Sequence, residues 1–280
     1  IFSPFYLLSI LYGAAVRIRL ALYSSGLLKV REIGCKVVSV GNITVGGTGK
    51  TPTVEFIARN LKEKGLKVAI LSRGYGRTGK GIGVVSDGQQ LLLGPEEAGD
   101  EPYMLARRLK NVPVFVGADR HELGRYALQR FPLDVIVLDD GFQHIRLKRD
   151  LDILLVDGEK GFGNAHLLPR GPLREPLSAM NRADIFLITK ASSDTGRIAD
   201  SIMDKQPEAD VFKSSYRPES IISLRDGAKT GLDAISGHRV MALSAIANPS
   251  SFITLLSSLG CTLVSEISFP DHHSYTAKEM

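Results

Sequence analysis

Val40–Pro52 reads VGNITVGGTGKTP, and this stretch decides the fold. The apolar run Lys36–Val40 before it predicts a strand, and the pattern of Thr51–Lys64 after it predicts a helix. Glycines between a strand and a helix let backbone N–H groups close on phosphate oxygens, and the helix N-terminus adds partial positive charge. We therefore expect Lys50 to reach the β- and γ-phosphates of ATP and the Thr51 hydroxyl to bind Mg²⁺. The predicted ATP-binding residues are Thr44, Gly46, Gly47, Thr48, Gly49, Lys50, Thr51 and Pro52.

The loop departs from the usual phosphate-loop pattern at one position. The pattern G-x-x-x-x-G-K-[ST] requires a glycine where this chain has Thr44. A deviant loop of dimeric regulatory ATPases, K-G-G-x-G-K-[ST], requires a lysine where this chain has Val45. That lysine acts on the nucleotide of a partner subunit, so its absence argues against a dimerisation ATPase. A regulatory or chaperone NTPase that acts on a partner protein remains the alternative to a kinase.

Outward from this loop, short β-branched runs alternate with helical patterns, which is typical of βαβ units and a parallel sheet buried on both faces. The sequence therefore predicts a doubly wound α/β domain. The expected strands are Lys36–Val40, Val68–Ser72, Val112–Val116, Asp134–Leu138, Asp152–Val156 and Asp184–Thr189. The expected helices include Thr51–Lys64, Glu101–Leu109 and Glu122–Phe131.

The pattern changes near Val211, where an extended stretch with a proline turn leads to a second, smaller α/β domain. We expect this domain to contain a strand at Val240–Ala245, a helix around Ser250–Leu259 and a strand at Thr262–Ile267. Since a helical pattern is only beginning where the chain stops, the domain is expected to be incomplete. The predicted divisions are an apolar helix at 1–30, the nucleotide-binding domain at 31–212, a linker at 213–224 and the second domain at 225–280.

The bulk composition indicates a globular protein: 44% of the 280 residues are hydrophobic and 23% are charged. The net charge of +5 and the pI near 9.1 suit phosphates, a nucleic acid or an anionic membrane. No basic block with interleaved aromatic residues is present, so nucleic-acid binding is not expected. The two cysteines, Cys35 and Cys261, lack metal-ligand spacing and are expected to be buried thiols.

The first residues are strongly apolar, and Ile1–Val16 reads IFSPFYLLSILYGAAV. A spanning helix needs about 20 apolar residues, and Arg17 and Arg19 interrupt this run. We therefore expect a helix that lies in a membrane interface with its arginines near the headgroups. A helix packed on the core of the domain is the alternative.

Acidic residues lie where parallel sheets bind ligands, at the carboxyl ends of strands. The segment 134–144, DVIVLDDGFQH, resembles a Walker B strand, so Asp139 or Asp140 is expected to hold a metal. Gln143 and His144 follow closely enough to face the same cleft, although His144 could serve only as a structural hydrogen-bond partner. Asp100 and Glu101 open a predicted helix, as a base or a metal-organising pair, or only as complements of the helix dipole.

Basic and titratable residues elsewhere in the chain are candidates for binding the molecule that accepts the phosphate group. Arginine binds anions in bidentate fashion, although a single arginine is more often only solvated. The candidates for binding the acceptor are Arg73, Tyr75, Arg77, Arg120, His144, Arg170 and Arg174. In the second domain FPDHHSY pairs Asp271 with His272, and a carboxylate beside an imidazole can orient it for proton transfer.

These motifs together resemble the tetraacyldisaccharide 4′-kinases of lipid A biosynthesis. The resemblance runs from residue 40 to residue 275 and rests on VGNITVGGTGKTP, LSRGYGR, GDEP, VFVGADR, VLDDGFQH, LLPRGPLREP and FPDHHSY. It implies a P-loop kinase fold in which Thr44 belongs to the family's own loop pattern. It also implies transfer of the ATP γ-phosphate, with Mg²⁺, to the 4′-hydroxyl of a lipid disaccharide 1-phosphate. The expected place is the cytoplasmic face of the inner membrane of a Gram-negative bacterium, with no obligate protein partner.

The resemblance also implies roles for individual residues. Lys50 and Thr51 match the phosphate lysine and the magnesium threonine, and Asp100 matches the proposed catalytic base. Asp271 and His272 match a pair in the second domain whose histidine supports that base. The residues expected around the metal and phosphates are Thr51, Glu101, Asp139, Asp140 and Gln143.

Overall fold

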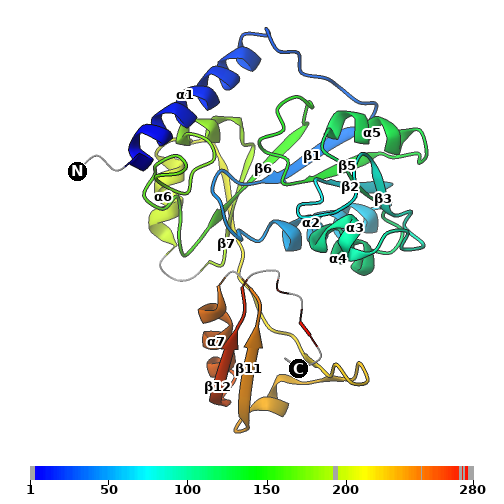
Figure 1. The fold of residues 1–280 in the computed structure, drawn as a ribbon, viewed down its shortest axis with the longest axis vertical. Coiled ribbons are helices and arrows are strands. Elements are labelled where there is room, and N and C mark those ends of the chain that lie inside the picture. Colours follow the sequence, from blue (N-terminus) through cyan, green and yellow to red (C-terminus); the bar gives the residue numbers. More distant parts are fainter. Residues whose placement is uncertain (1–3, 192–194, 247, 271–272, 274, 277–280) are drawn as a thin grey trace. The chain divides into compact units, whose positions relative to one another are not determined.

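A computed structural model describes residues 4–191, 195–246, 248–270, 273 and 275–276. The chain divides into two compact units, Ile1–Ser215 and Tyr216–Met280. The first unit contains the phosphate loop and the large sheet, and the second contains two short sheets and a helix. Figure 1 shows the elements of both units along the chain.

The described residues of the first unit form an eight-stranded sheet in the order β3-β4-β2-β5-β1-β6-β7-β8. All neighbouring strands are parallel except β3 and β4. The strands are β1 (Lys36–Gly41), β2 (Val68–Ser72), β3 (Gly83–Ser86), β4 (Val114–Val116), β5 (Val135–Asp139), β6 (Leu151–Asp157), β7 (Ile185–Thr189) and β8 (Asp210–Lys213). Because β1 lies between β5 and β6, the loop that follows it emerges at the centre of the carboxyl edge.

Helices cover both faces of this sheet, as a buried parallel sheet requires. They are α2 (Lys50–Glu63), α3 (Pro95–Ala98), α4 (Asp100–Arg108), α5 (Arg120–Leu128), the 3₁₀ helix η1 (Leu177–Arg182) and α6 (Gly196–Met203). Val54 of α2 and Leu105 of α4 pack with Val40, Ile70 and Val137 on one face. On the other face α5 packs over β2 and β5, while η1 and α6 pack over β6 and β7. The α/β architecture with its doubly wound sheet is confirmed.

The structure adds two strands to the predicted sheet. The antiparallel edge strand β3 was not expected, and neither was β8, which the sequence suggested as the start of an extended connection. Lys213, placed in the linker by the sequence, belongs to β8 and pairs with Ile188. Both strands have only four residues and lie at the ends of the sheet, so they lack the long apolar run that marks a central strand.

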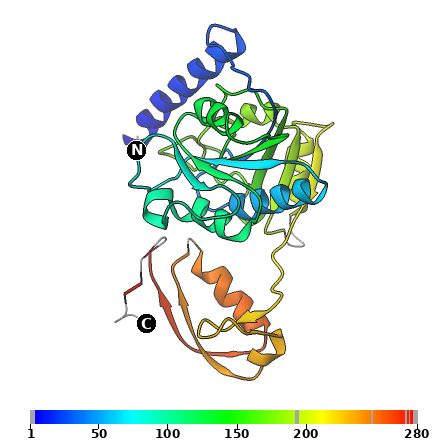
Figure 2. The same ribbon diagram turned by 90° about the vertical axis from the view of Figure 1, so that its right-hand side faces the viewer.

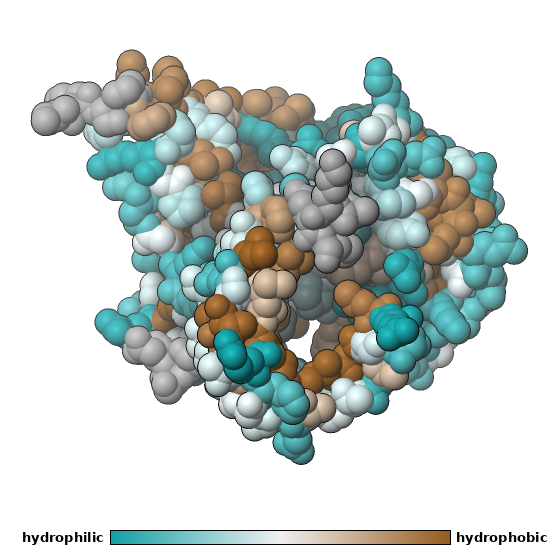
Figure 3. Space-filling model, turned by 60° about the horizontal axis from the view of Figure 1, so that its bottom comes forward, coloured by the Kyte–Doolittle hydropathy of each residue, from teal (hydrophilic) through white to brown (hydrophobic). Residues whose placement is uncertain are grey.

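The N-terminal helix α1 (Pro4–Ser24) runs across the outside of the sheet unit, as Figures 1 and 2 show. It has 21 residues and continues past Arg17 and Arg19. The expectation that the apolar run is too short to span a membrane is therefore wrong. Phe5–Ser24 is long and apolar enough to cross a bilayer, and only 6% of its most apolar window is buried within the protein. Brown side chains gather along this helix at the upper left of Figure 3. The described residues thus confirm an apolar helix that the core of the unit does not enclose.

The second unit contains a small parallel sheet of β11 (Arg239–Ser244) and β12 (Thr262–Ser268) joined through α7 (Pro249–Ser258). These elements match the predicted strand, helix and strand to within one residue at every end. A hairpin of β9 (Ile221–Ile222) and β10 (Lys229–Thr230) and the 3₁₀ helix η2 (Leu232–Ile235) precede them.

Candidate active site

The phosphate loop joins β1 to α2 and depends on two left-handed glycines. Gly46 has φ 111° and Gly49 has φ 77°, a region that side chains with a Cβ rarely adopt. Gly49 caps α2 without a side-chain hydrogen bond, and the first turn of the helix contains no acidic residue. No carboxylate of the helix's own first turn therefore neutralises the partial positive charge of this helix end, which suits an anionic ligand.

Thr44 stands in place of the usual first glycine because this side of the loop pairs with another segment. It forms an isolated antiparallel bridge with Leu173. The Val45 N–H donates to the Pro172 carbonyl at 2.8 Å, and the Arg174 N–H donates to the Ile43 carbonyl at 2.7 Å. Extended backbone at this point suits a β-branched residue better than glycine. The segment around Leu173 thus acts as a short strand that supports the loop.

Lys50 lies at the start of α2 with its side chain 12% exposed. Its Nζ lies 3.4 Å from Asn42 Oδ1 and 3.6 Å from Asp140 Oδ1. Arg174 donates to both carboxylate oxygens of Asp140, at 2.9 and 3.1 Å. Burial alone raises the pKa of Asp140, but Lys50 and Arg174 outweigh it and hold that pKa below its usual value. Lys50 therefore faces an ionised carboxylate and an amide oxygen at the mouth of the loop.

Asp140 adopts a left-handed backbone with φ 52°. Such a conformation costs about 1–3 kcal/mol for a residue with a side chain and is found most often at functional sites. The turn that begins here also passes close to the end of β1, because a Cβ on Gly41 would lie 2.6 Å from Phe142 Cβ. The turn 140–144 is thus pressed against the base of the phosphate loop.

Asp139 ends β5 and is 1% exposed. Its Oδ2 accepts a hydrogen bond from Ser72 Oγ at 2.9 Å, while its Oδ1 is buried without a hydrogen-bond partner among the described residues. Burial and the nearby charge of Glu101 raise the pKa of Asp139 to about 6. An orphaned carboxylate oxygen beside a phosphate loop fits one ligand of Mg²⁺, which is commonly held by one or two carboxylates and the substrate phosphates. Within the described part of the chain, no cluster of three or more His, Cys, Asp and Glu side chains could hold a metal alone.

Asp100 and Glu101 begin α4, and both are exposed. The loop after β2 packs against this helix start: a Cβ on Gly99 would lie 2.9 Å from the Tyr75 carbonyl, and one on Gly74 would lie 2.8 Å from the Ala98 carbonyl. The predicted acceptor loop and the predicted base are therefore adjacent. The Tyr75 side chain is 81% exposed.

Arg120 and His144 are held by the protein itself. Arg120 is 3% exposed, and its guanidinium donates to the Gly117 carbonyl. Burial lowers the Arg120 pKa to about 10 against the opposing effect of Asp139. His144 Nε2 accepts from the Arg120 N–H at 3.3 Å, and burial and the Arg120 charge lower the His144 pKa to about 4. His144 Nε2 therefore serves as a hydrogen-bond acceptor for the backbone, and a contact of His144 with the lipid substrate stays a prediction.

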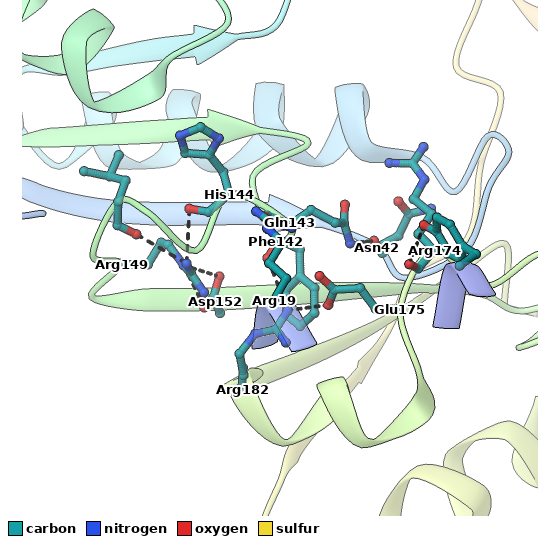
Figure 4. Close-up of polar contacts among 12 residues, drawn as sticks. Arg19, Asn42, Phe142, Gln143, His144, Arg149, Asp152, Arg174, Glu175 and Arg182 are labelled. Atoms are coloured by element: carbon teal, nitrogen blue, oxygen red, sulfur yellow. Dashed lines mark hydrogen bonds and ion pairs between the residues drawn. The ribbon is translucent and has the colours of Figure 1, made fainter. Parts of the chain in front are cut away.

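Gln143 connects the turn to the base of the phosphate loop, as Figure 4 shows. Its Nε2 donates to the Asn42 carbonyl at 2.8 Å. Of the remaining arginines, Arg170 lies over the Tyr6 ring at 4.9 Å, and Arg73 and Arg77 lie close enough to Arg120 to lower its pKa. Contacts of these arginines with an acceptor stay predictions. Asp271 and His272 lie outside the described residues.

Sequence reasoning missed several polar residues that the fold adds to the site. Asn42 lies within the quoted loop, and its amide oxygen is 3.4 Å from Lys50 Nζ. Lys190, at the end of β7, donates to the Gly47 carbonyl at 3.0 Å and pairs with Asp157. Thr189 Oγ1 donates to the Thr48 carbonyl at 3.0 Å. Position at the carboxyl ends of predicted strands was the available signal for Asp157, Thr189 and Lys190.

Comparison with known proteins agrees with this geometry. A family model described as tetraacyldisaccharide-1-P 4′-kinase matches residues 2–280. The tetraacyldisaccharide 4′-kinase of Syntrophus aciditrophicus is 42% identical over 293 residues, which cover 99% of this chain and 78% of that protein. The enzyme of the same name from Desulfatibacillum aliphaticivorans is 43% identical over 282 residues, covering 98% of this chain and 75% of that protein. The crystal structure of LpxK from Aquifex aeolicus in complex with ATP has 36% identity and a TM-score of 0.78, and the match covers 96% of this chain and 82% of that one.

Proposed function

Since this chain belongs to the tetraacyldisaccharide-1-P 4′-kinase family, we propose that its phosphate loop and the carboxylates beside it carry out the reaction of that family. The protein is an ATP-dependent kinase that phosphorylates the 4′-hydroxyl of tetraacyldisaccharide 1-phosphate in lipid A biosynthesis. The observation that supports this assignment of the site is the position of Lys50, with its Nζ at the start of α2 between Asn42 and Asp140.

In this proposal Lys50 and the N-terminus of α2 bind the β- and γ-phosphates. The γ-phosphoryl group passes to the 4′-oxygen of the sugar, the bond to the β-phosphate oxygen breaks, and ADP leaves. Lys50 neutralises charge as it develops on the phosphate oxygens, and the hydrogen bonds from Arg174 Nη1 to both carboxylate oxygens keep Asp140 in place beside it. Thr51, Asp139 and Asp140 would hold Mg²⁺, which when bound neutralises phosphate charge and orients the phosphate chain.

Asp100 is proposed to accept the proton of the 4′-hydroxyl. It begins α4 next to the loop after β2, on the same edge of the sheet as the phosphate loop. A sugar hydroxyl is far less acidic than a carboxylic acid, so this proton transfers late and most of the acceleration comes from positioning and charge neutralisation.

We also propose that α1 lies in the interface of the inner membrane, on its cytoplasmic face. Its exposed apolar residues include Phe5, Leu7, Leu8, Ile10, Leu11 and Ile18. Arg17 and Arg19 are exposed farther along the helix, where they suit anionic headgroups. Ser9 and Tyr12 bond to the sheet unit, so one side of the helix is occupied by protein. This favours a helix that lies on the membrane over one that spans it.

The test is transfer of labelled phosphate from ATP to tetraacyldisaccharide 1-phosphate in detergent micelles. Lys50→Met and Asp100→Asn are each expected to reduce transfer by a factor on the order of 100 or more, because they remove charge stabilisation and the proton acceptor. Lys62→Met, in the last turn of the same helix, is the control and should retain transfer. ATP hydrolysis that proceeds without transfer, indifferent to the lipid, would favour the regulatory NTPase instead.

A further inference from the structure

Helix α1 bonds to the sheet unit through side chains that donate to backbone carbonyls. Ser9 Oγ donates to the Leu167 carbonyl, Tyr12 Oη to the Arg174 carbonyl, and Arg19 Nη2 to the Gln143 carbonyl, each at 2.8 Å. Two of these carbonyls belong to Arg174 and Gln143. The side chains of these two residues donate hydrogen bonds to Asp140 and Asn42, the neighbours of Lys50. A single residue, Arg174 or Gln143, therefore separates helix α1 from the residues that contact Lys50 in the phosphate loop.

The first of these connections passes through Arg174. Tyr12 fixes the Arg174 carbonyl, while the Arg174 side chain holds Asp140 at 2.9 Å and Asp140 lies 3.6 Å from Lys50 Nζ. The Arg174 N–H also donates to the Ile43 carbonyl in the loop itself. A shift of Tyr12 therefore moves a residue that contacts both the loop backbone and the carboxylate beside Lys50.

The second connection passes through Gln143, seen beside Arg19 and Asn42 in Figure 4. Arg19 fixes the Gln143 carbonyl, and Gln143 Nε2 donates to the Asn42 carbonyl at 2.8 Å. The Asn42 side-chain oxygen then accepts from Lys50 Nζ at 3.4 Å. Two independent chains of hydrogen bonds and ion pairs thus join α1 to Lys50 from different sides.

We propose that Tyr12 and Arg19 are positioning residues that couple the seating of α1 in a lipid surface to ATP binding at the phosphate loop. The inference rests on the proposed function, since it needs the nucleotide at Lys50 and α1 at a membrane. Coupling of this kind is reciprocal: if lipid strengthens ATP binding by some factor, ATP strengthens lipid binding by the same factor.

The direction of the coupling follows from what holds α1. Most of its large apolar side chains face solvent, so apolar packing on the sheet unit is limited to a few residues near Tyr12, and the polar bond from Arg19 is exposed. Exposed hydrogen bonds compete with water and open easily. Lipid contact with the apolar side chains restricts the helix to one position, which keeps the Tyr12 and Arg19 bonds closed and the loop in the geometry that binds phosphate.

The experiment measures the affinity of a non-hydrolysable ATP analogue by equilibrium dialysis, with and without vesicles. The vesicles contain phosphatidylethanolamine and phosphatidylglycerol but no disaccharide acceptor, so that substrate binding does not contribute. Wild-type protein is expected to bind the analogue on the order of 5-fold more tightly with vesicles. The Tyr12→Phe, Arg19→Met double variant should bind with one affinity in both conditions.

Matched controls separate coupling from membrane attraction. Arg17→Met removes the same charge from the same helix, and Arg17 is exposed and has no hydrogen bond in the described part of the chain. Tyr23→Phe removes a hydroxyl that likewise makes no hydrogen bond among the described residues. Arg17→Met should bind vesicles as weakly as Arg19→Met does, and at vesicle concentrations that saturate each variant both controls should keep the lipid effect on ATP affinity.

Each result decides the question. Wild-type affinity for the analogue that is the same with and without vesicles overturns the coupling, whatever the variants do. A lipid effect that survives in the double variant, or that disappears equally in Arg17→Met, also overturns it. Transfer assays with the lipid acceptor on the same preparations show separately whether the proposed function holds, because a kinase without the coupling still transfers phosphate.

Discussion

Lys190 Nζ lies 2.6 Å from a carboxylate oxygen of Asp157, and this ion pair joins the carboxyl ends of β6 and β7. The same ammonium donates to the Gly47 carbonyl at 3.0 Å, so the pair also holds the phosphate loop from its far side. Lys190 adopts a left-handed backbone with φ 50°, a conformation that commonly marks functional positions.

Replacing Lys190 with methionine should weaken ATP binding while the fold is retained. A hydrogen bond from a charged group contributes about 1.5–3 kcal/mol, so the KM for ATP should rise on the order of 10-fold. Lys160→Met is the control, because Lys160 is an exposed lysine in the turn that follows Asp157. Steady-state kinetics with varied ATP measures the change, and equal KM values in the two variants would contradict the role of Lys190.

Gly41→Ala should destabilise the protein. The added Cβ would lie 2.6 Å from Phe142 Cβ and 2.7 Å from the Phe142 nitrogen, and backbone at this point cannot give way cheaply. Overpacking of this kind costs about 1–3 kcal/mol of unfolding free energy. Gly34→Ala serves as the control, since a Cβ added there would meet no described atom within 4 Å and its φ is not left-handed. Urea unfolding of both variants should show a lower midpoint for Gly41→Ala alone.

The buried pair of Glu175 and Arg182 should respond asymmetrically to substitution. Arg182 Nη2 lies 2.5 Å from Glu175 Oε2, and the two side chains are 23% and 2% exposed. Removing the arginine leaves the Glu175 carboxylate buried and without access to water. Removing the glutamate charge leaves the Arg182 guanidinium, which is partly exposed and can be hydrated. Arg182→Met should therefore cost about 3 kcal/mol and Glu175→Gln less.

A double-variant cycle on this pair checks the prediction by urea unfolding. The Glu175→Gln, Arg182→Met protein should lose less unfolding free energy than the sum of the single variants, because the second change removes the stranded charge of the first. Additive losses would show that the two side chains do not stabilise each other.

Cys35 should react slowly with alkylating reagents until the pH is high. Burial, aided by the charge of Asp150, raises its pKa from 9.0 to about 11. The folded protein therefore keeps the thiol protonated between these two values while the unfolded chain ionises, so this group's contribution to stability is lost as the pH rises above 9. Iodoacetamide modification of a Cys261→Ser variant should accelerate steadily from pH 8 to pH 10. A rate that levels off as the pH approaches 10 would indicate an ordinary thiol with a pKa near 9.0.

Much of the fold could be predicted because each central strand or helix is specified by the residues within its own segment of sequence. The strands β1, β2 and β5 are apolar runs buried on both faces, and α2 follows its glycine loop directly. The edge strand β3 could not be predicted, because its four residues become a strand only by pairing with β4. The apolar run at the N-terminus was judged too short for a spanning helix because Arg17 and Arg19 interrupt its hydropathy, although they do not interrupt α1.

The site divides in the same way. Lys50 and Asp139 were predictable because a local motif and a strand end place them. The pairing of Lys190 with Gly47 joins residues 143 positions apart, and that of Gln143 with Asn42 joins residues 101 positions apart. Such contacts depend on the order of strands in the sheet, which the residues at either position do not reveal.

The bonds of α1 have a consequence for biosynthesis. Ser9 and Tyr12 are translated long before their acceptors at Leu167 and Arg174, which lie 158 and 162 residues later. At bacterial rates of synthesis this interval is on the order of ten to thirty seconds. During that time the apolar helix has left the ribosome without the carbonyl acceptors that hold it on the sheet unit. The phosphate loop depends on the same segment, since the Val45 N–H donates to the Pro172 carbonyl and the Arg174 N–H donates to the Ile43 carbonyl. The loop is therefore completed only when that segment has been synthesised.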